Sequence, residues 1–463
     1  MNTIWFPDLS VAQGPKYKTL TNAIRDAVVT GQLAKGERLP PVRDLAWALK
    51  ITPGTVARAY RWLVEDGVLQ AAVGRGTFVA ERSYARANPE DSLINVVNDS
   101  AVDFRSCRVP DLGQGEVINN ILARVARNAE NKFVDYPTFV TDVAARRAVR
   151  EWIGPTHAGR FDEDDVVLGV GAQNCCILAL QTILRGAHPV IMTEQLAYPG
   201  VRRAAQLLRA EIVGVKMDSQ GIIPEAFEEA VRQHGGQVLL TSAEVHSPTT
   251  INTPFERKRQ IAEIARHHNV QIIEDDCHRI ATPKSLSYRA IAPELAWYIG
   301  SLTKSVAASL RFGYMVPPVD LAPVTRQVAQ SNFYGLPQPI LDLCEELILS
   351  GAASDIRKQV VQSCQSRVHE ALNTLGRWDI RWRPDAPFIW LKMPKGWRGS
   401  SFAVACKTRG IRVKPADEFA LPDGNSPNAV RLAINAGGDT DRRTSALREI
   451  NNILQHPEQD AEI

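Results

Sequence analysis

Apolar and polar positions in the first 80 residues alternate with the spacing of short amphipathic helices. Apolar residues recur every three or four positions in three segments, which predicts three helices. Only Lys50 and Ile51 separate the second segment from the third, and Thr52 followed by Pro53 is typical of a helix start. So tight a turn predicts a helix-turn-helix, and two short strands after it predict a wing. The expected helices span 17–30, 41–49 and 52–66, and the expected strands span 67–70 and 74–79.

Beyond residue 80 the pattern changes twice. The segment 81–101 lacks periodicity and is rich in polar residues, which predicts a linker between domains 1–80 and 102–463. After it, short apolar segments alternate with helical ones, which predicts an α/β domain with a mostly parallel sheet and helices on both faces. The expected strands span 166–170, 189–192, 211–215, 238–240, 270–273 and 295–299, and the expected helices span 172–184, 201–208 and 257–267.

Composition is that of an ordinary globular protein. Of the 463 residues, 44% are hydrophobic and 23% are charged, so the chain is long enough for two or three domains with ample core. No secretory pattern opens the sequence and no apolar run reaches the roughly 18 residues of a membrane span, which predicts a cytoplasmic protein. The seven cysteines form no C-x-x-C pair, so we expect reduced thiols and no zinc site.

Charge is unevenly distributed along the chain. Residues 1–80 contain ten Lys/Arg and six Asp/Glu, whereas the remaining residues contain 44 and 45. A charge excess is usually only a solvated face, but in a helix-turn-helix segment it points to a polyanion partner.

Candidate chemistry centres on the segment 300–314. Lys304 lies among small and hydroxyl side chains after an apolar run, and desolvation there would lower the pKa of its amine. An amine of this kind can react with a carbonyl group to form a Schiff base. A loop lysine near a surface Arg311 is the alternative interpretation, and this segment alone leaves both open.

Other polar groups follow predicted strands. The turn 169–171 precedes a predicted helix, so that the backbone N–H groups of Ala172 and Gln173 could hold a phosphate. An acidic run that includes Asp275 ends another strand, where it requires a cation or a protonated nitrogen. A metal site is the rival interpretation, but His278 is isolated. Phosphate turn, acid, lysine and arginine, in this order, are the parts that pyridoxal 5′-phosphate (PLP) requires.

The N-terminal motifs resemble those of GntR-type winged helix-turn-helix regulators. The segment 36–46 is similar to the family motif G-x-x-L-P-S-x-R-x-L-A, and 55–60 and 74–79 are similar to the recognition-helix and wing motifs. Many members have an arginine where this chain has Pro53, so base readout would be reduced or shifted to neighbouring residues. The resemblance implies double-stranded DNA as the partner. The residues that it places at the DNA are Arg43, Thr52, Thr55, Arg58, Arg75 and Gly76.

The large domain resembles fold-type I aminotransferases of the aspartate aminotransferase superfamily over roughly 102–456. This resemblance implies that Lys304 is the Schiff-base lysine of PLP and that Asp275, or Asp276 if the register is one off, contacts the pyridine nitrogen. It further implies that Arg431 grips an acid group of the ligand. The implied phosphate ligands are Arg311, Ser301, Ala172 and Gln173, and the implied ring-stacking residue is Tyr198.

Two departures from this family affect the same cofactor oxygen. The usual tyrosine after the strand-end aspartate is absent, since the chain reads Cys277 and His278 there, and Ser247 stands in the stretch that usually supplies an asparagine. Ser247 or His278 could substitute as the contact to the phenolic oxygen. The two changes argue against efficient transamination, whereas cofactor binding depends on Lys304 and the phosphate ligands.

A GntR-like domain ahead of an aminotransferase-like domain is the arrangement of the MocR subfamily of bacterial transcriptional regulators, which the chain resembles over almost its whole length. The resemblance implies a PLP-dependent regulator, rather than an enzyme, that senses an amine or amino-acid effector by aldimine exchange at Lys304. It also implies a homodimer that reads two half-sites. The alternatives are an active aminotransferase with an appended DNA-binding domain and a DNA-binding protein whose large domain only dimerises.

Overall fold

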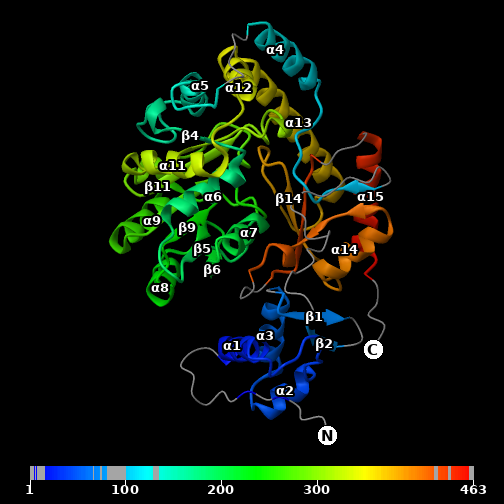
Figure 1. Cartoon of the computed structure of the whole chain (residues 1–463). Coiled ribbons are helices and arrows are strands. Elements are labelled where there is room, and N and C mark those ends of the chain that lie inside the picture. The colour runs from blue at the N-terminus through cyan, green and yellow to red at the C-terminus, as the bar shows by residue number, and fades with distance from the viewer. Residues whose placement is uncertain are drawn as a thin grey trace. The chain divides into compact units, whose positions relative to one another are not determined.

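The computed structural model of the chain divides into two units, 1–92 and 93–463, each with its own hydrophobic core (Figure 1). Each unit is described by itself. Of the predicted linker 81–101, only residue 101 lies among the described residues. The structure describes residues 5, 7, 16–65, 67–72, 76–80, 101–128, 135–421, 426–435 and 440–457.

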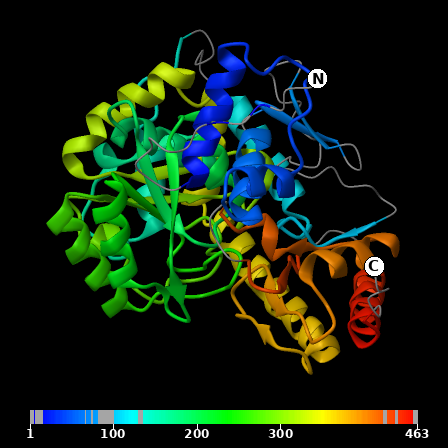
Figure 2. The same ribbon diagram turned by 90° about the horizontal axis from the view of Figure 1, so that it is seen from below.

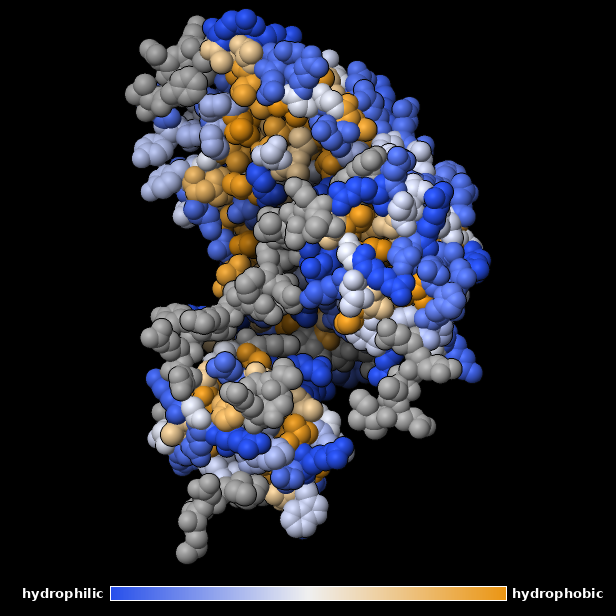
Figure 3. Space-filling model, turned by 90° about the vertical axis from the view of Figure 1, so that its right-hand side faces the viewer, coloured by the Kyte–Doolittle hydropathy of each residue, from blue (hydrophilic) through white to orange (hydrophobic). Residues whose placement is uncertain are grey.

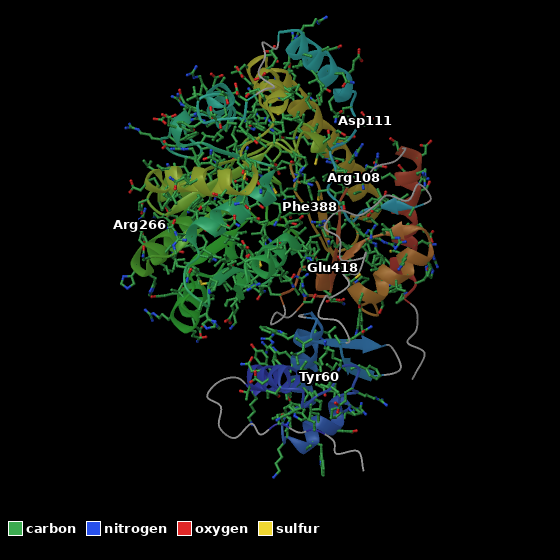
Figure 4. All side chains as sticks on the ribbon, viewed as in Figure 1. Tyr60, Arg108, Asp111, Arg266, Phe388 and Glu418 are labelled. Carbon is green, nitrogen blue, oxygen red and sulfur yellow. The ribbon has the colours of Figure 1, made fainter. Side chains whose placement is uncertain are left out.

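The first unit is a winged helix-turn-helix, as its sequence pattern predicts. Its elements are α1 (Lys16–Val29), α2 (Val42–Ala48), α3 (Pro53–Glu65), β1 (Leu69–Ala72) and β2 (Gly76–Val79). The Thr52 hydroxyl accepts a hydrogen bond from the Thr55 backbone N–H at 3.3 Å, which caps α3. Tyr60 lies buried in the core of the unit, and its hydroxyl donates to the Pro40 carbonyl at 2.8 Å (Figure 4). Strands β1 and β2 pair antiparallel.

A seven-stranded sheet forms the centre of the second unit. Its strands are β4 (Val167–Gly169), β5 (Val190–Glu194), β6 (Glu211–Val215), β9 (Val238–Thr241), β10 (Gln271–Asp275), β11 (Ala296–Ser301) and β12 (Gly313–Val316). Their order is β4-β12-β11-β10-β9-β5-β6. Strand β12 is antiparallel to both of its neighbours, and the other pairs are parallel.

Helices cover both faces of this sheet because alternate strand residues point in opposite directions. Val238 and Leu240 of β9 pack in the core with residues of α6 and α7, whereas Leu239 between them packs with residues of α8 and α9. Strands and helices therefore alternate as the sequence predicts, with bounds within about three residues of those expected. These helices are α6 (Ala172–Ile183), α7 (Pro199–Leu207), α8 (Pro224–His234) and α9 (Phe255–His268).

A smaller α/β subdomain follows the long helix α13 (Ala352–Leu375). Its antiparallel sheet has the order β13-β14-β17-β16. Figure 2 shows α14 in orange beside α15 in red. The remaining elements of the subdomain are β13 (Ile380–Arg381), β14 (Ile389–Lys392), α14 (Gly399–Thr408), β16 (Lys414–Pro415), β17 (Ala429–Leu432) and α15 (Thr440–Gln455).

The first strand of the large unit is tied to this subdomain, far away in the sequence. Strand β3 (Val102–Asp103) pairs in parallel with β15 (Ile411–Arg412). The Phe104 carbonyl then accepts a hydrogen bond from the Ala433 N–H at 2.8 Å. The chain after residue 101 is therefore held against the C-terminal strands.

The remaining helices pack at the edge of the large unit. Helix α12 contacts both α4 and α5. Figure 3 shows hydrophobic residues gathered in the upper left part of the visible face, whereas hydrophilic residues predominate on its right-hand side. No described helix is long and apolar enough to cross a membrane. The elements not yet given are α4 (Gln114–Asn128), α5 (Val143–Ile153), β7 (Met217–Asp218), β8 (Gly221–Ile222), α10 (Tyr288–Ile291), α11 (Ala322–Phe333) and α12 (Gln338–Leu349).

One ion pair is completely enclosed beside the central sheet. Lys258 of α9 donates to the Glu274 carboxylate of β10 at 3.1 Å, and both side chains are buried. Glu274 also accepts from the Tyr288 backbone N–H at 2.6 Å, and Lys258 donates to the Leu286 carbonyl at 3.0 Å. These bonds compensate for the cost of removing two charges from water.

We expect Lys258→Met to lower the free energy of unfolding of the large unit by about 3–5 kcal/mol, because Glu274 would remain buried without its counter-charge. Arg259→Met, at the next position of α9, is the matched control. Arg259 makes exposed ion pairs, so its loss should leave the unfolding midpoint almost unchanged. Urea unfolding followed by circular dichroism measures both, and equal losses would contradict the prediction.

Candidate functional site

Lys304 lies in the turn that follows β11, and its amine points into the protein. The amine donates to the Cys107 carbonyl at 2.6 Å. No carboxylate within the described part of the chain lies at ion-pair distance from it. Ser301, at the end of β11, is buried, and its hydroxyl accepts from the Thr303 N–H at 3.4 Å. Lys304 is half-buried, and Arg311, the other residue of the alternative interpretation, is exposed.

Asp276, directly after β10, belongs to a cluster of buried polar side chains. Its carboxylate accepts from Arg279 Nε at 2.5 Å and from the Tyr298 hydroxyl at 2.8 Å. His157 Nε2 is 3.5 Å from the same oxygen. Burial would raise the pKa of Asp276, but Arg279 and His157 outweigh it and hold the pKa below its ordinary value. Oδ2 of Asp276 is therefore already occupied, whereas its Oδ1 is buried without a hydrogen-bond partner among the described residues.

Asp275 faces a different environment from its neighbour. It accepts a hydrogen bond from the Cys277 backbone N–H at 3.1 Å, and no cation in the described chain lies within 4.0 Å of its carboxylate. Burial raises its pKa, although Cys277 and the charge of Lys304 oppose this shift. Of the two aspartates, Asp275 is the one whose carboxylate has no cation at ion-pair distance among the described residues, which makes it the better candidate for a protonated nitrogen.

The turn before α6 forms an anion cradle with Arg311. Gly171 has φ +80°, and a Cβ there would lie 2.7 Å from the Arg311 guanidinium. Only glycine permits both this conformation and this approach. Arg311 Nη2 donates to the Val170 carbonyl at 3.1 Å, and no described carboxylate pairs with it. The free backbone N–H groups at the start of α6, at Ala172 and Gln173, add positive potential beside the guanidinium.

A group of aromatic and thiol side chains packs together, with members from the loop after β10 and from the C-terminal subdomain. The rings of Tyr198 and His278 meet edge to face at 6.2 Å, and the rings of His278 and Phe388 meet at 5.6 Å. Burial raises the pKa of Tyr198 to about 12. Burial and the charge of Lys304 hold the pKa of His278 well below its usual range, so the imidazole is neutral. Cys277 Sγ lies 3.6 Å from His278 Nδ1.

Arg431, on β17, is buried among aromatic and polar partners. It donates to the Ser247 hydroxyl at 3.0 Å and to the Arg105 carbonyl at 2.5 Å. Its guanidinium lies over the rings of Phe388 at 5.3 Å and Phe419 at 4.8 Å. Its Nε is buried without a hydrogen-bond partner among the described residues. Ser247 is thus placed at the arginine that the resemblance assigns to ligand binding.

Sequence reasoning missed the backbone groups that complete this site. The carbonyls of Cys107 and Arg105 contact Lys304 and Arg431 across some 200 and 300 residues of sequence. No local pattern marks a carbonyl as a partner, so only the fold identifies these contacts. Together, an inward amine, an acid with raised pKa and an arginine against a glycine turn fit the aldehyde, ring nitrogen and phosphate of PLP.

In the first unit, the residues assigned to DNA differ in their surroundings. Arg43 is exposed on α2. The hydroxyls of Thr52 and Thr55 lie 2.9 Å apart at the start of α3. Arg58 is half-buried, and its guanidinium stacks 3.7 Å over the Tyr17 ring. Arg58 is therefore held against α1 in this structure.

A further basic side chain, Arg38, lies beside the wing strand β2. Gly76 has φ +113°, and a Cβ there would lie 3.0 Å from Arg38 Nε. Arg38 is exposed, and its place within the motif 36–46 is the signal that could have added it to the candidates. Arg75 lies outside the described residues.

Comparison with known proteins matches each unit to a family. Residues 102–450 match the family "Aminotransferase class I and II", and residues 16–79 match "Bacterial regulatory proteins, gntR family". The chain is 24% identical to the uncharacterized HTH-type transcriptional regulator YdeF of Bacillus subtilis, over 97% of this chain and 96% of the relative. It is 23% identical to the HTH-type transcriptional regulator TauR of Rhodobacter capsulatus, over 92% and 94% of the two chains.

Solved structures agree on the fold of the large unit. An archaeal alanine:glyoxylate aminotransferase superposes with a TM-score of 0.68 at 19% identity, covering 77% of this chain and 91% of its own. The α-aminoadipate aminotransferase LysN of Thermus thermophilus superposes with a TM-score of 0.69 at 20% identity, covering 80% and 95%. The predicted fold-type I aminotransferase architecture is therefore confirmed.

We expect Asp276→Asn to cost the large unit about 3–5 kcal/mol at pH 7, because Arg279 would lose its buried counter-ion. Folding lowers the pKa of Asp276, so its stabilisation is present above the unfolded pKa of about 3.9 and fades as the pH falls through the lower folded pKa. The difference in unfolding free energy between wild type and variant should therefore shrink between pH 7 and about pH 3. Urea titrations at both pH values measure it.

Asp275→Asn is the matched control. Folding raises the pKa of Asp275, so its ionised form disfavours the unliganded fold at pH 7 and the variant should not be destabilised there. Equal destabilisation by the two substitutions would show that the adjacent carboxylates do not differ as described.

Proposed function

We propose that this chain, which belongs to the class I and II aminotransferase family and begins with a gntR-family domain, senses an amine or amino-acid effector through PLP. It is a transcriptional regulator with an aminotransferase-like domain, the MocR-type architecture. The gntR-family domain binds double-stranded DNA. We propose that two copies of the chain assemble and bind two half-sites.

The observation that carries the proposal is the inward Lys304 amine, whose hydrogen-bond acceptor among the described residues is a backbone carbonyl. Lys304 would hold the aldehyde end of PLP, and Asp275 would keep the ring nitrogen protonated. Arg311 and the start of α6 would bind the phosphate, with Ser301 at the end of β11 beside them. When bound, PLP supplies a carbon for which Lys304 and an effector amine compete.

Arg431 supports an acidic effector. Its buried Nε has no partner among the described residues, and its other bonds, to Ser247 and the Arg105 carbonyl, are ones that a ligand carboxylate can replace. A ligand shifts a conformational equilibrium only by its differential affinity for the two states. The exchange of partners at Lys304 and Arg431 provides such a difference.

The surroundings of the cofactor oxygen favour sensing over turnover. His278 is held neutral, burial keeps Cys277 a thiol, and Ser247 already binds Arg431. None of these groups replaces the usual pair, a tyrosine hydroxyl and an asparagine amide that both donate to the phenolic oxygen of PLP. An aminotransferase with an appended DNA-binding domain is the second candidate, favoured by the fold of the large unit.

We expect the full chain incubated with PLP to gain a visible absorption band. Borohydride should abolish this band by reducing the Schiff base, which leaves the cofactor permanently bound to the chain. Lys304→Ala should carry no permanently bound cofactor, because no amine would remain at that position. Lys284→Ala, which removes an exposed lysine, is the control and should behave as wild type. A wild-type chain that stays colourless would refute the PLP proposal. Repeated conversion of a 2-oxo acid would favour the aminotransferase instead.

We expect Arg43→Ala to weaken binding to duplex DNA and to reduce the slope of log K against log salt by about 1, because one phosphate contact is lost. Arg232→Ala, an exposed arginine on α8, should change neither value. Fluorescence anisotropy with a labelled duplex between about 50 and 200 mM salt measures both. Binding that does not depend on salt would contradict the assignment of Arg43.

A further inference from the structure

A second cation lies in the same row of the C-terminal sheet as Arg431. The register places Trp390 of β14 and Lys414 of β16 directly opposite Arg431, one on each side. Directly opposite residues on neighbouring strands project from the same face of a sheet. Lys414 therefore projects on the side of the sheet that carries Arg431.

Lys414 and Arg431 share one aromatic surface. Lys414 Nζ is 5.4 Å from the centre of the Phe419 ring, over which the Arg431 guanidinium also lies. The Lys414 side chain is only 12% exposed. Burial and the charge of Arg431 lower the pKa of Lys414. Like charges directly opposite one another destabilise a sheet, so the fold retains this pair at a cost.

The negative charge near these cations is small and replaceable. Glu418, on the turn η5 (Ala416–Glu418), pairs with Lys414 at 3.2 Å, but its side chain is 47% exposed. Figure 4 shows Glu418 in the C-terminal subdomain. A half-exposed ion pair contributes little to stability. Among the described residues no carboxylate pairs with Arg431, so the two cations have one weakly held counter-ion.

We infer that Lys414 is a second effector-anchoring residue and that the effector is an amine carrying two acid groups, one for Arg431 and one for Lys414. This inference rests on the proposed function. The second acid group replaces Glu418 at Lys414 and relieves the repulsion between the two cations. An effector with a single acid group leaves the Lys414–Glu418 pair in place and gains nothing there, so the site selects diacids.

The test compares two probes that differ by one carboxylate. L-Glutamate and L-2-aminobutyrate are titrated into the PLP-loaded full chain while its visible spectrum is recorded. We expect glutamate to bind at least tenfold more tightly to wild type. Lys414→Met should weaken the binding of glutamate about tenfold and change the affinity for aminobutyrate by no more than about twofold. Lys414→Arg should retain the preference for glutamate. Glu418→Gln should tighten glutamate severalfold, because the competing carboxylate is gone.

A second measurement needs no cofactor. Glutarate, which has two acid groups and no amine, should raise the melting temperature of the unloaded full chain more than butyrate does, and Lys414→Met should abolish the difference. Unchanged melting of this variant without ligand shows that it folds. Equal responses to one and two acid groups in wild type would overturn the inference while leaving the PLP proposal intact. A glutarate effect without any amine-dependent spectrum would refute the PLP proposal and support Lys414.

Discussion

The hydrogen-bonded register between β10 and β11 is the constraint on which the candidate site depends. Asp275 pairs with Ile299, so both strands end at the same edge of the sheet, and the turn that carries Lys304 starts beside the aspartate. Antiparallel β12 returns from that turn between β11 and β4, and brings Arg311 to the glycine turn of α6. A slip of one residue in this register would exchange the two strand-end aspartates between the sheet faces.

The same register explains why two adjacent carboxylates have opposite properties. Asp276 is held charged by Arg279 and His157, while burial raises the pKa of Asp275, which has no counter-ion among the described residues. The ionised carboxylate and the one with a raised pKa thus lie side by side at the end of one strand. Asp276 forms the ion pair at the sheet edge, and Asp275 can bind a ligand.

Much of this arrangement follows from local patterns, and the rest does not. Apolar alternation and strand-end polar residues predicted β10 and β11 ahead of Lys304, because both signals lie within a few residues. Strand β12, which follows Arg311, was not predicted. The choice between Asp275 and Asp276 requires knowing what packs on each face, which the pattern leaves open. The stacking of Arg58 on Tyr17 requires the packing of α1 against α3. Contacts between distant segments depend on tertiary packing, which a local periodicity does not encode.

The pairing of β3 with β15 fixes the first strand of the large unit to the C-terminal subdomain. The short stretch after it supplies the two carbonyls that Lys304 and Arg431 hold, at Cys107 and Arg105. Ligand groups that take over the amine and the guanidinium would release both carbonyls at once. The stretch would keep its backbone bonds at β3 and Phe104 and the buried Cys107 side chain, so the loss of these two contacts would loosen only the backbone around Arg105 and Cys107.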